Sequence, residues 1–442
     1  MANLKVWWFP EWSLDKQKLE NEVKNLIADN FESYGYMNIE TPLMERNTVL
    51  LAKSGNEAAK QIFGAYWLAQ GKDDLKDYSI RFDLTVPFAR YFIDHENEIS
   101  LPFKRFQIQK VYRWERSQKW RYKELYQCDI DVIDWILDNN YEIEVITTLF
   151  QTLNNLFAYL NIDLKPVVHL NDKRFYTHLF RLLDVSEEKQ NKLLGLFDDY
   201  HKLPKEKFDF ILNTILEWKE RLIAHLITPD IINNIEIIQD SDLKSFLYQM
   251  SYVVQNLKKN WVNVVFDPFI VRGLEYYSGT VFETFIDWHK DYGSICSGGR
   301  YDKLVSFIRK ANNLKWNEYW GFGWSIWLSR ILYVLEEDNF LNKKESLVDV
   351  VFFNMWNIGF DLKNQLANEL RQNAVRAEIY YNNAKLDKQF KYADSKNARI
   401  WIFIGEDEIN SGNIKIKDLW QRQEFTIPAQ SLVAEIKKIL QN

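Results

Sequence analysis

The clearest hydrophobic pattern of the chain lies in residues 104–134, where apolar and polar side chains alternate twice. Phe106 and Ile108 alternate with Arg105 and Gln107, a period of two that is typical of a half-buried strand. The returning stretch divides its side chains between two faces: Leu125, Gln127, Asp129 and Asp131 on one, and Cys128, Ile130 and Val132 on the other. The pattern predicts two antiparallel strands joined by a polar loop.

Other stretches carry a helical period or shorter apolar runs. Residues 13–33 place apolar side chains at helical spacing behind a serine cap, and residues 37–41 indicate a strand that ends at Pro42. Residues 79–87 alternate in the manner of a strand. We further expect a helix at 138–154 and short strands at 167–171 and 264–269.

The remaining regions differ in composition from this core. Residues 172–257 are rich in Leu, Lys and Glu with helical periodicity, whereas residues 345–442 alternate apolar strands with helical stretches near 360–373 and 385–394. Such alternation favours a small α/β domain with a mostly parallel sheet. We therefore expect an α+β protein in four parts: a first core part (1–171), a helical insertion (172–257), a second core part (258–335) and a C-terminal α/β domain (345–442).

Composition and charge narrow the class of protein. The chain has 442 residues, 47% of them hydrophobic and 27% charged, which is ordinary for a globular protein. With a net charge of −6, contact with nucleic acid must depend on local basic patches. Cys128 and Cys296 form no disulfide framework, which fits a reducing cytoplasm. No apolar run has the length of a membrane span.

The loop between the two alternating stretches concentrates cations. Arg113, Arg116, Lys119, Arg121 and Lys123 outnumber Glu115 and Glu124 there. Guanidinium groups match phosphate oxygens, and carboxylates on the return strand could hold an amine or an imidazolium. Charge alone more often marks a solvated hairpin tip, so the order of the residues must decide.

That order resembles a known family. Tyr112-Arg113-Trp114-Glu115 is similar to the aromatic-Arg-x-Glu signature, motif 2, of class II aminoacyl-tRNA synthetases. The following SQKWRYKELYQCDIDVID resembles the histidyl-tRNA synthetases, which often read (S/P)QKGRYREFYQCDFDIIG. RFDLTVPFARY (81–91), RGLEYYSGTVFE (272–283), GSICSGGRYDKLV (293–305) and GFGWSIWLSRIL (321–332, motif 3) resemble further segments of that family.

Helix 13–33 and the strand to Pro42 look like motif 1, the dimer-forming motif of the class. KLDKQFKYAD and FIGEDE look like parts of the family's anticodon-binding domain. The resemblance implies a class II antiparallel-sheet catalytic core with a helical insertion, a C-terminal anticodon-binding domain, a homodimer and a cytoplasmic location.

The resemblance also implies roles for individual residues. Arg113 and Arg272 would be catalytic. The ATP-binding residues would be Arg113, Glu115, Arg121, Leu125 and Arg330. The histidine-binding residues would be Asp83, Thr85, Gln127, Asp131, Arg272, Tyr276, Tyr277 and Tyr301. Gln118 would contact the acceptor end of the tRNA.

The implied reaction joins histidine to ATP and then transfers the histidyl group to tRNA(His), with Mg²⁺ bridging the phosphates. No His/Cys cluster indicates a protein metal site. The alternatives are a catalytically inactive paralogue, either the synthetase-like regulatory subunit of ATP phosphoribosyltransferase or a tRNA-binding protein. That regulatory subunit lacks the anticodon domain, so residues 345–442 argue against it.

The chain departs from the family's pattern in a few places. Leu125 replaces the Phe that stacks on adenine, and Asp83 and Asp131 are shorter than the Glu of many members. More unusually, tryptophan outnumbers glycine, 17 to 15, although glycine makes up about 7% of average proteins.

Several tryptophans coincide with family glycines. Trp120 and Trp327 occupy motif glycines, and Trp261 matches a frequent one. Trp324 matches a glycine in some members, Trp135 lies beside a usual glycine position, and Trp114 fills a variable position. Because an indole is hard to fit where backbone touches phosphate or takes positive φ, we hypothesise that UGA codons read as glycine underlie many of these tryptophans.

Overall fold

The computed structural model describes residues 4–52, 59–66, 69, 77–114, 122–200, 203–216, 226–271, 276–286, 293–337, 346–356 and 358–441. The chain divides into two compact units, one comprising Met1–Pro10 and Val23–Phe340 and the other Glu11–Glu22 and Leu341–Asn442. Each unit is described by itself below.

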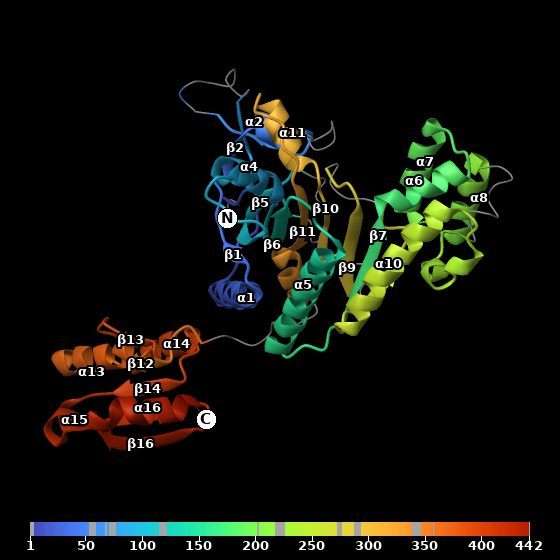
Figure 1. The fold of residues 1–442 in the computed structure, drawn as a ribbon. Helices are drawn as coiled ribbons and strands as arrows, with labels where there is room; N and C mark the ends of the chain where they lie inside the picture. The colour runs from blue at the N-terminus through green and yellow to red at the C-terminus, as the bar shows by residue number, and fades with distance from the viewer. Residues whose placement is uncertain are drawn as a thin grey trace. The chain divides into compact units, whose positions relative to one another are not determined.

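An eight-stranded sheet forms the centre of the first unit (Figure 1). Its strands in spatial order are β1 (Met37–Asn38), β5 (Phe103–Tyr112), β6 (Glu124–Asp134), β11 (Trp320–Ile326), β10 (Cys296–Arg300), β9 (Thr280–Ile286), β7 (Pro166–Asp172) and β8 (Val264–Phe266). The pairs β1–β5 and β7–β8 at the two edges are parallel, and the pairs between them are antiparallel. The prediction of an antiparallel core is confirmed.

The predicted hairpin is β5 and β6, with Arg105 opposite Asp131 and Gln107 opposite Asp129. The expectation of half-buried strands is wrong, because the polar face is buried as well: Arg105 and Gln107 are fully buried. Helix α5 (Asn139–Tyr159) packs on β6 and β11 and begins at the predicted place, where Asp138 accepts a hydrogen bond from the Asn140 N–H.

The strand-like reading of residues 79–87 is only partly right. Strand β4 (Tyr78–Ile80) ends early, and helix α4 (Thr85–His95) begins at Thr85. Pro87 lies in the first turn of α4, where a missing N–H costs nothing. Strand β4 joins β2 (Met44–Arg46) and β3 (Phe63–Gly64) in a small three-stranded sheet.

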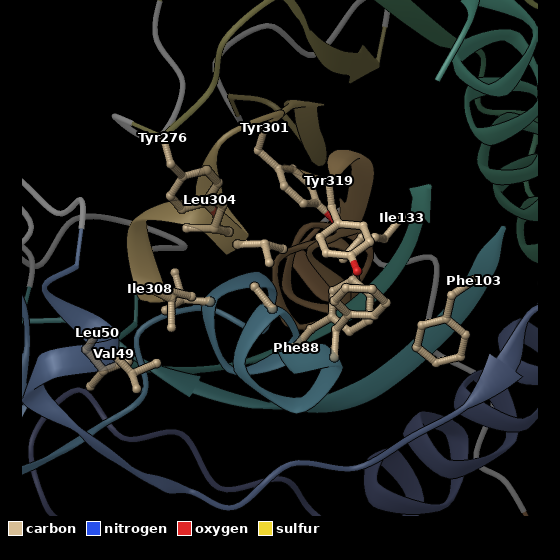
Figure 2. Close-up of a cluster of buried hydrophobic side chains, with 14 of the residues drawn as sticks. Val49, Leu50, Phe88, Phe103, Ile133, Tyr276, Tyr301, Leu304, Ile308 and Tyr319 are labelled. Atoms are coloured by element: carbon tan, nitrogen blue, oxygen red, sulfur yellow. The ribbon is translucent and has the colours of Figure 1, made fainter. Parts of the chain in front are cut away.

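A hydrophobic cluster lies beside the central sheet and reaches the candidate site (Figure 2). Helices α2 (Asn47–Leu50), α4 and α11 (Leu304–Ala311) contribute Val49, Leu50, Phe88, Leu304 and Ile308 to it. Tyr276 and Tyr301 belong to the same cluster, so their rings are held by packing while their hydroxyls face polar groups. Helix α12 (Leu328–Glu337) completes this part of the unit, and helix α1 (Leu14–Ser33) is divided between the two units after Glu22.

The helices of residues 173–259 gather beyond β7 in Figure 1. They are α6 (Lys173–Leu182), α7 (Glu187–Asp198), α8 (Lys205–Leu216) and α10 (Ser241–Lys259), with the 3-10 turns η4 (Pro229–Asn233) and η5 (Ile235–Ile237). Asp172 caps α6 and Asp240 caps α10 by accepting backbone hydrogen bonds from Arg174 and Leu243. The region is helical, as its composition predicted.

The second unit holds a five-stranded sheet in the order β13 (Ala377–Ile379), β12 (Val350–Phe352), β14 (Ile400–Phe403), β15 (Asn413–Asp418) and β16 (Gln423–Pro428). The first three strands are parallel, as predicted, and β15–β16 form an antiparallel hairpin that the sequence analysis did not identify. Its helices are α13 (Phe360–Gln372), α14 (Leu386–Ser395), α15 (Glu406–Ser411), η7 (Ala429–Ser431) and α16 (Leu432–Gln441).

Candidate active site

A cavity of about 220 Å³ opens over the middle of the eight-stranded sheet. Side chains from β6, β9, β10 and β11 form its floor, and residues before α4 and β9 form its wall. It brings together these predicted residues: Asp83, Thr85, Arg113, Gln127, Tyr276, Tyr277 and Tyr301. They come from segments far apart in the sequence, so the fold assembles the site.

Asp83 anchors one end of the cavity. Its Oδ1 accepts a hydrogen bond from the Val86 N–H at 3.3 Å, which satisfies a backbone donor at the start of α4. Its Oδ2 accepts a hydrogen bond from the Tyr276 hydroxyl at 2.7 Å. Burial raises the pKa of Asp83, while Tyr276 and the nearby Arg113 oppose that rise. The carboxylate is therefore fixed in direction and available to a cationic group.

Asp131 is held more tightly and does not line the cavity. Its Oδ1 accepts a hydrogen bond from the Tyr301 hydroxyl at 2.6 Å, and its Oδ2 forms an ion pair with the fully buried Arg105 at 2.5 Å. Burial raises the pKa of Asp131 and the Arg105 charge opposes it. This carboxylate orients Tyr301, and its own oxygens are already engaged.

Two glycines of β11 make room for this arrangement. A Cβ at Gly323 would lie 1.9 Å from Oδ1 of Asp131, and a Cβ at Gly321 would lie 2.0 Å from the ring of Tyr301. Both approaches are far closer than van der Waals contact, so a side chain at either position would displace a group of the site.

Asp129 is a residue of the site to which the family resemblance gave no role. It is almost fully buried, lines the cavity, and lies between Gln127 and Asp131 on the same face of β6. Its Oδ1 and the Oε1 of Gln127 have no hydrogen-bond partner among the described residues. Burial raises the pKa of Asp129 to about 6, opposed by Arg105. The period-two alternation of β6 was the signal that could have identified it.

Two arginines, Arg113 in the lining of the cavity and Arg330 near it, bring positive charge to the site. Arg113 follows β5 and its Nε donates a hydrogen bond to the Phe82 carbonyl at 2.8 Å. Arg330 lies in the first turn of α12, as predicted, and donates to the Ser294 carbonyl. The indole of Trp327 lies between them, 5.1 Å from the guanidinium carbon of Arg113 and 4.2 Å from that of Arg330.

Not every predicted residue can be placed in the cavity. Leu125 is half-buried on β6, and neither it nor Asp131 nor Arg330 lines the cavity. Four predicted residues lie outside the described part of the chain: Glu115, Gln118, Arg121 and Arg272.

The described residues hold no group of three or more side chains that could bind a metal ion together. Likewise, no helix within the described ranges is long and apolar enough to cross a bilayer.

Comparison with known proteins gives the same family over almost the whole chain. The family profile described as histidyl-tRNA synthetase matches residues 10–315, and the profile described as anticodon binding domain matches residues 349–439. The histidine–tRNA ligase of Clostridium acetobutylicum is 32% identical over 424 residues, which cover 93% of this chain and 94% of that protein.

Solved structures agree with this result. The histidyl-tRNA synthetase of Nostoc sp. PCC 7120 superposes with a TM-score of 0.84 at 28% identity, covering 99% of this chain and 100% of that one. A protein of Bacillus halodurans, titled as an ATP phosphoribosyltransferase regulatory subunit/histidyl-tRNA synthetase, superposes with a TM-score of 0.70 at 19% identity, covering 91% and 98%. The second likeness shows the fold alone. By sequence and by fold, the chain belongs to the histidyl-tRNA synthetase family.

Proposed function

We propose that this protein attaches histidine to tRNA(His) in two steps, both at the cavity over the central sheet. One observation carries the proposal: the carboxylates Asp83 and Asp129 and the guanidinium of Arg113 line the same cavity. The carboxylates suit an amino acid that carries an ammonium and an imidazole, and the guanidinium suits the phosphates of ATP.

At the carboxylate end, Asp83, Thr85 and Gln127 hold the α-amino group of histidine. Tyr276 positions Asp83 through the 2.7 Å hydrogen bond between them. The imidazole lies toward Tyr277 and Tyr301, with Asp131 orienting Tyr301. Asp129 is the carboxylate of β6 that reaches the cavity, and it accepts an imidazole N–H.

Arg113 and Arg330 bind the phosphates of ATP, and Arg272 stabilises the negative charge where the reacting carboxylate meets the α-phosphate. Glu115, Arg121 and Leu125 belong to the nucleotide side. Fixed cations there offset the repulsion between a carboxylate and a phosphate as they are brought together.

The reaction is a pair of substitutions. A carboxylate oxygen of histidine attacks the α-phosphorus, an O–P bond forms, and pyrophosphate leaves with the electrons of the broken P–O bond. A hydroxyl of the terminal tRNA ribose then attacks the histidyl carbonyl carbon, loses its proton, and AMP leaves.

Mg²⁺ would enter this site with the nucleotide. Mg²⁺ keeps several waters and binds substrate phosphates with one or two carboxylates, which suits a described site without a cluster of metal ligands. When bound, the ion would neutralise phosphate charge.

The other assignments concern the whole protein. The anticodon-binding domain, residues 345–442, and Gln118 contact the tRNA. The catalytic core consists of residues 1–171 and 258–335, and the helical insertion of residues 172–257 separates these two parts. The protein works as a homodimer in the cytoplasm. The regulatory-subunit alternative is less favoured, because the chain carries the anticodon-binding match at residues 349–439.

Histidine-dependent exchange of pyrophosphate into ATP tests the first step. The parent chain is compared with a variant that carries Trp120→Gly, Trp324→Gly and Trp327→Gly, and alanine or glutamine replaces histidine as a negative control. Exchange in either protein supports a synthetase. Two folded proteins that are both silent would instead favour the inactive paralogue.

A further inference from the structure

Three tryptophans of the described chain adopt a backbone conformation that suits glycine. The φ angle is +64° at Trp8, +61° at Trp261 and +55° at Trp356. In this left-handed region the Cβ atom crowds the backbone, so bulky side chains are rarely found there, whereas glycine enters it freely. The Asn and Asp residues with positive φ, such as Asn161 and Asp184, are by contrast an ordinary occurrence. Ala374 and Arg422 also have positive φ, but their side chains are smaller or unbranched.

Trp261 occupies the helix-ending position that glycine usually fills. Helix α10 ends at Lys259, and Asn260 is its C-cap. The Val262 N–H then donates to the Leu257 carbonyl at 3.0 Å, and the Trp261 N–H donates to the Lys258 carbonyl at 3.1 Å. These two bonds define a Schellman motif with position 261 at C′. The indole is 86% exposed, so packing does not compensate for the crowded backbone.

Trp8 and Trp356 occupy turn positions of the same kind. The Phe9 N–H donates to the Val6 carbonyl at 3.2 Å, which makes Trp8 the third residue of a turn, the position that takes glycine in type II turns. The Ile358 N–H donates to the Met355 carbonyl at 3.0 Å, so Trp356 is the second residue of a turn. Type I′ and II′ turns have positive φ at this second position.

Trp327 presents a different conflict, one of space. Its ring lines the cavity and lies against the guanidinium groups of both Arg113 and Arg330. Its Nε1 is buried without a hydrogen-bond partner among the described residues. Under the proposed function these two arginines bind phosphate oxygens. The Trp327 indole, which lies against both guanidinium groups, therefore occupies the space that a phosphate would take.

We propose that positions 8, 261, 327 and 356 carry glycine in the protein that the cell makes, through UGA codons read as glycine. Glycine at position 327 then leaves the phosphate subsite between Arg113 and Arg330 open. The backbone angles support glycine at positions 8, 261 and 356 without reference to activity. Glycine at position 327 and the open phosphate subsite rest on the proposed function. The backbone argument does not extend to Trp114, Trp135 or Trp324, where φ is not positive.

Peptide mass spectrometry of the protein purified from the cells that carry its gene tests the first part directly. We expect the mass of glycine at positions 8, 261, 327 and 356, together with UGA at those codons. Tryptophan in the peptides that contain positions 8, 261 and 356 would overturn the proposal.

A second measurement tests the backbone argument in recombinant protein. A variant with Trp8→Gly, Trp261→Gly and Trp356→Gly should unfold at a temperature about 2–4 °C or more above that of the parent, because three crowded backbones are relieved. Trp316→Gly is the matched control, since Trp316 is exposed but has no positive φ, and it should give no rise. An equal or lower unfolding temperature in the triple variant would contradict the proposal.

ATP titration of Trp327→Gly tests the second part. We expect ATP to bind at least tenfold more tightly to Trp327→Gly than to the parent, with Trp420→Gly, an exposed position of the other unit, unchanged from the parent. If native peptides show glycine and Trp327→Gly still fails to bind ATP, the proposed function fails while the glycine assignment stands. Equal ATP affinity in parent and variant, with both binding, would overturn the blocked-subsite argument.

Discussion

At the scale of single residues, Asp129 and Asp131 show how neighbouring carboxylates on one strand face acquire different roles. Asp131 is engaged by Arg105 and by the Tyr301 hydroxyl. Asp129 lines the cavity instead. The difference comes from the partners that other segments bring to each carboxylate, because both side chains project from the same face of β6.

The first prediction separates these two roles by substitution. Asp129→Asn should raise KM for histidine by about 10–100-fold, the range expected when a charge-assisted hydrogen bond of roughly 1.5–3 kcal/mol is lost, while KM for ATP changes little. Pyrophosphate-exchange kinetics at varied histidine and ATP measure both constants. Asp131→Asn is the comparison, and it should also lower protein stability because it leaves Arg105 buried without its partner charge. An unchanged KM for histidine in Asp129→Asn would exclude the proposed contact.

The second prediction concerns the pH dependence of stability. The pKa of Asp129 rises from 3.8 to about 6 on folding, so between these values the native state binds more protons than the unfolded state does. The contribution of this carboxyl group to the free energy of unfolding therefore falls as pH rises from about 4 to 6, by roughly 1–3 kcal/mol. Denaturant unfolding of the parent and of Asp129→Asn at pH 5 and pH 7 measures it. Asp129→Asn should gain stability relative to the parent at pH 7, and a gain of equal size at both pH values would contradict this account.

At the scale of secondary-structure elements, β11 shows why particular residue types are needed in one strand. Its alternate glycines, Gly321 and Gly323, lie where Tyr301 and Asp131 cross the face of the sheet. A β-strand of larger residues would have better intrinsic propensity. The site instead requires the backbone of β11 to lie directly against the side chains of Tyr301 and Asp131.

The third prediction follows from this close approach. Gly323→Ala should destabilise the protein by about 1–3 kcal/mol, as overpacking does, and should weaken histidine binding by displacing Asp131 and Tyr301. Gly195→Ala in α7 is the matched control, because a Cβ there meets nothing within 4 Å. That control should be neutral or stabilise the protein by up to about 1 kcal/mol. Denaturant unfolding and histidine titration of both variants provide the measurement, and equal behaviour would refute the steric argument.

The observed elements also explain why two predictions of secondary structure were wrong or incomplete. Residues 79–87 alternate, yet β4 stops at Ile80 and α4 begins at Thr85. The alternation is real but short, and Asp83 ends it by accepting the Val86 N–H at the start of the helix. The β15–β16 hairpin was missed although Ile414 and Ile416 alternate with Lys415 and Lys417 in β15. Its apolar alternation is short, and exposed charged residues such as Lys415 and Glu424 surround it.

At the scale of the whole molecule, the two compact units correspond to two tasks of the proposed function. The first unit contains the cavity for histidine and ATP. The second contains the segment that matches the anticodon-binding domain. Since tRNA is recognised largely through its phosphates and unpaired bases, exposed cations of the second unit are expected to affect charging and not activation.

The fourth prediction tests that division. Lys385, Lys388 and Lys391, at the start of α14 and along it, are exposed and spaced three residues apart. Changing all three to Glu should raise KM for tRNA(His) several-fold and leave histidine-dependent pyrophosphate exchange unchanged, because phosphate contacts are lost in the unit that does not contain the cavity. Lys437→Glu with Lys438→Glu on α16 is the control for charge alone. A loss of exchange, or an equal effect in the control, would count against α14 as a tRNA-binding helix.

The sequence by itself determined much of this molecule. Period-two alternation predicted the β5–β6 hairpin, and strand–helix alternation predicted the parallel part of the second unit. The order of the motifs indicated the family without knowledge of the fold. These features depend on residues near one another in the chain, and their patterns repeat over enough positions to be unambiguous. The positions of Asp83, Gln127 and Tyr301 in one site followed only from the resemblance.

Tertiary structure alone decided the rest. It showed that Arg105 engages Asp131, that Asp129 reaches the cavity, and that the indole of Trp327 lies between Arg113 and Arg330. It also showed left-handed backbone at three tryptophans. Composition could count tryptophans and glycines but could not give their backbone angles. The distances between side chains depend on contacts among segments far apart in the sequence, which no local pattern encodes.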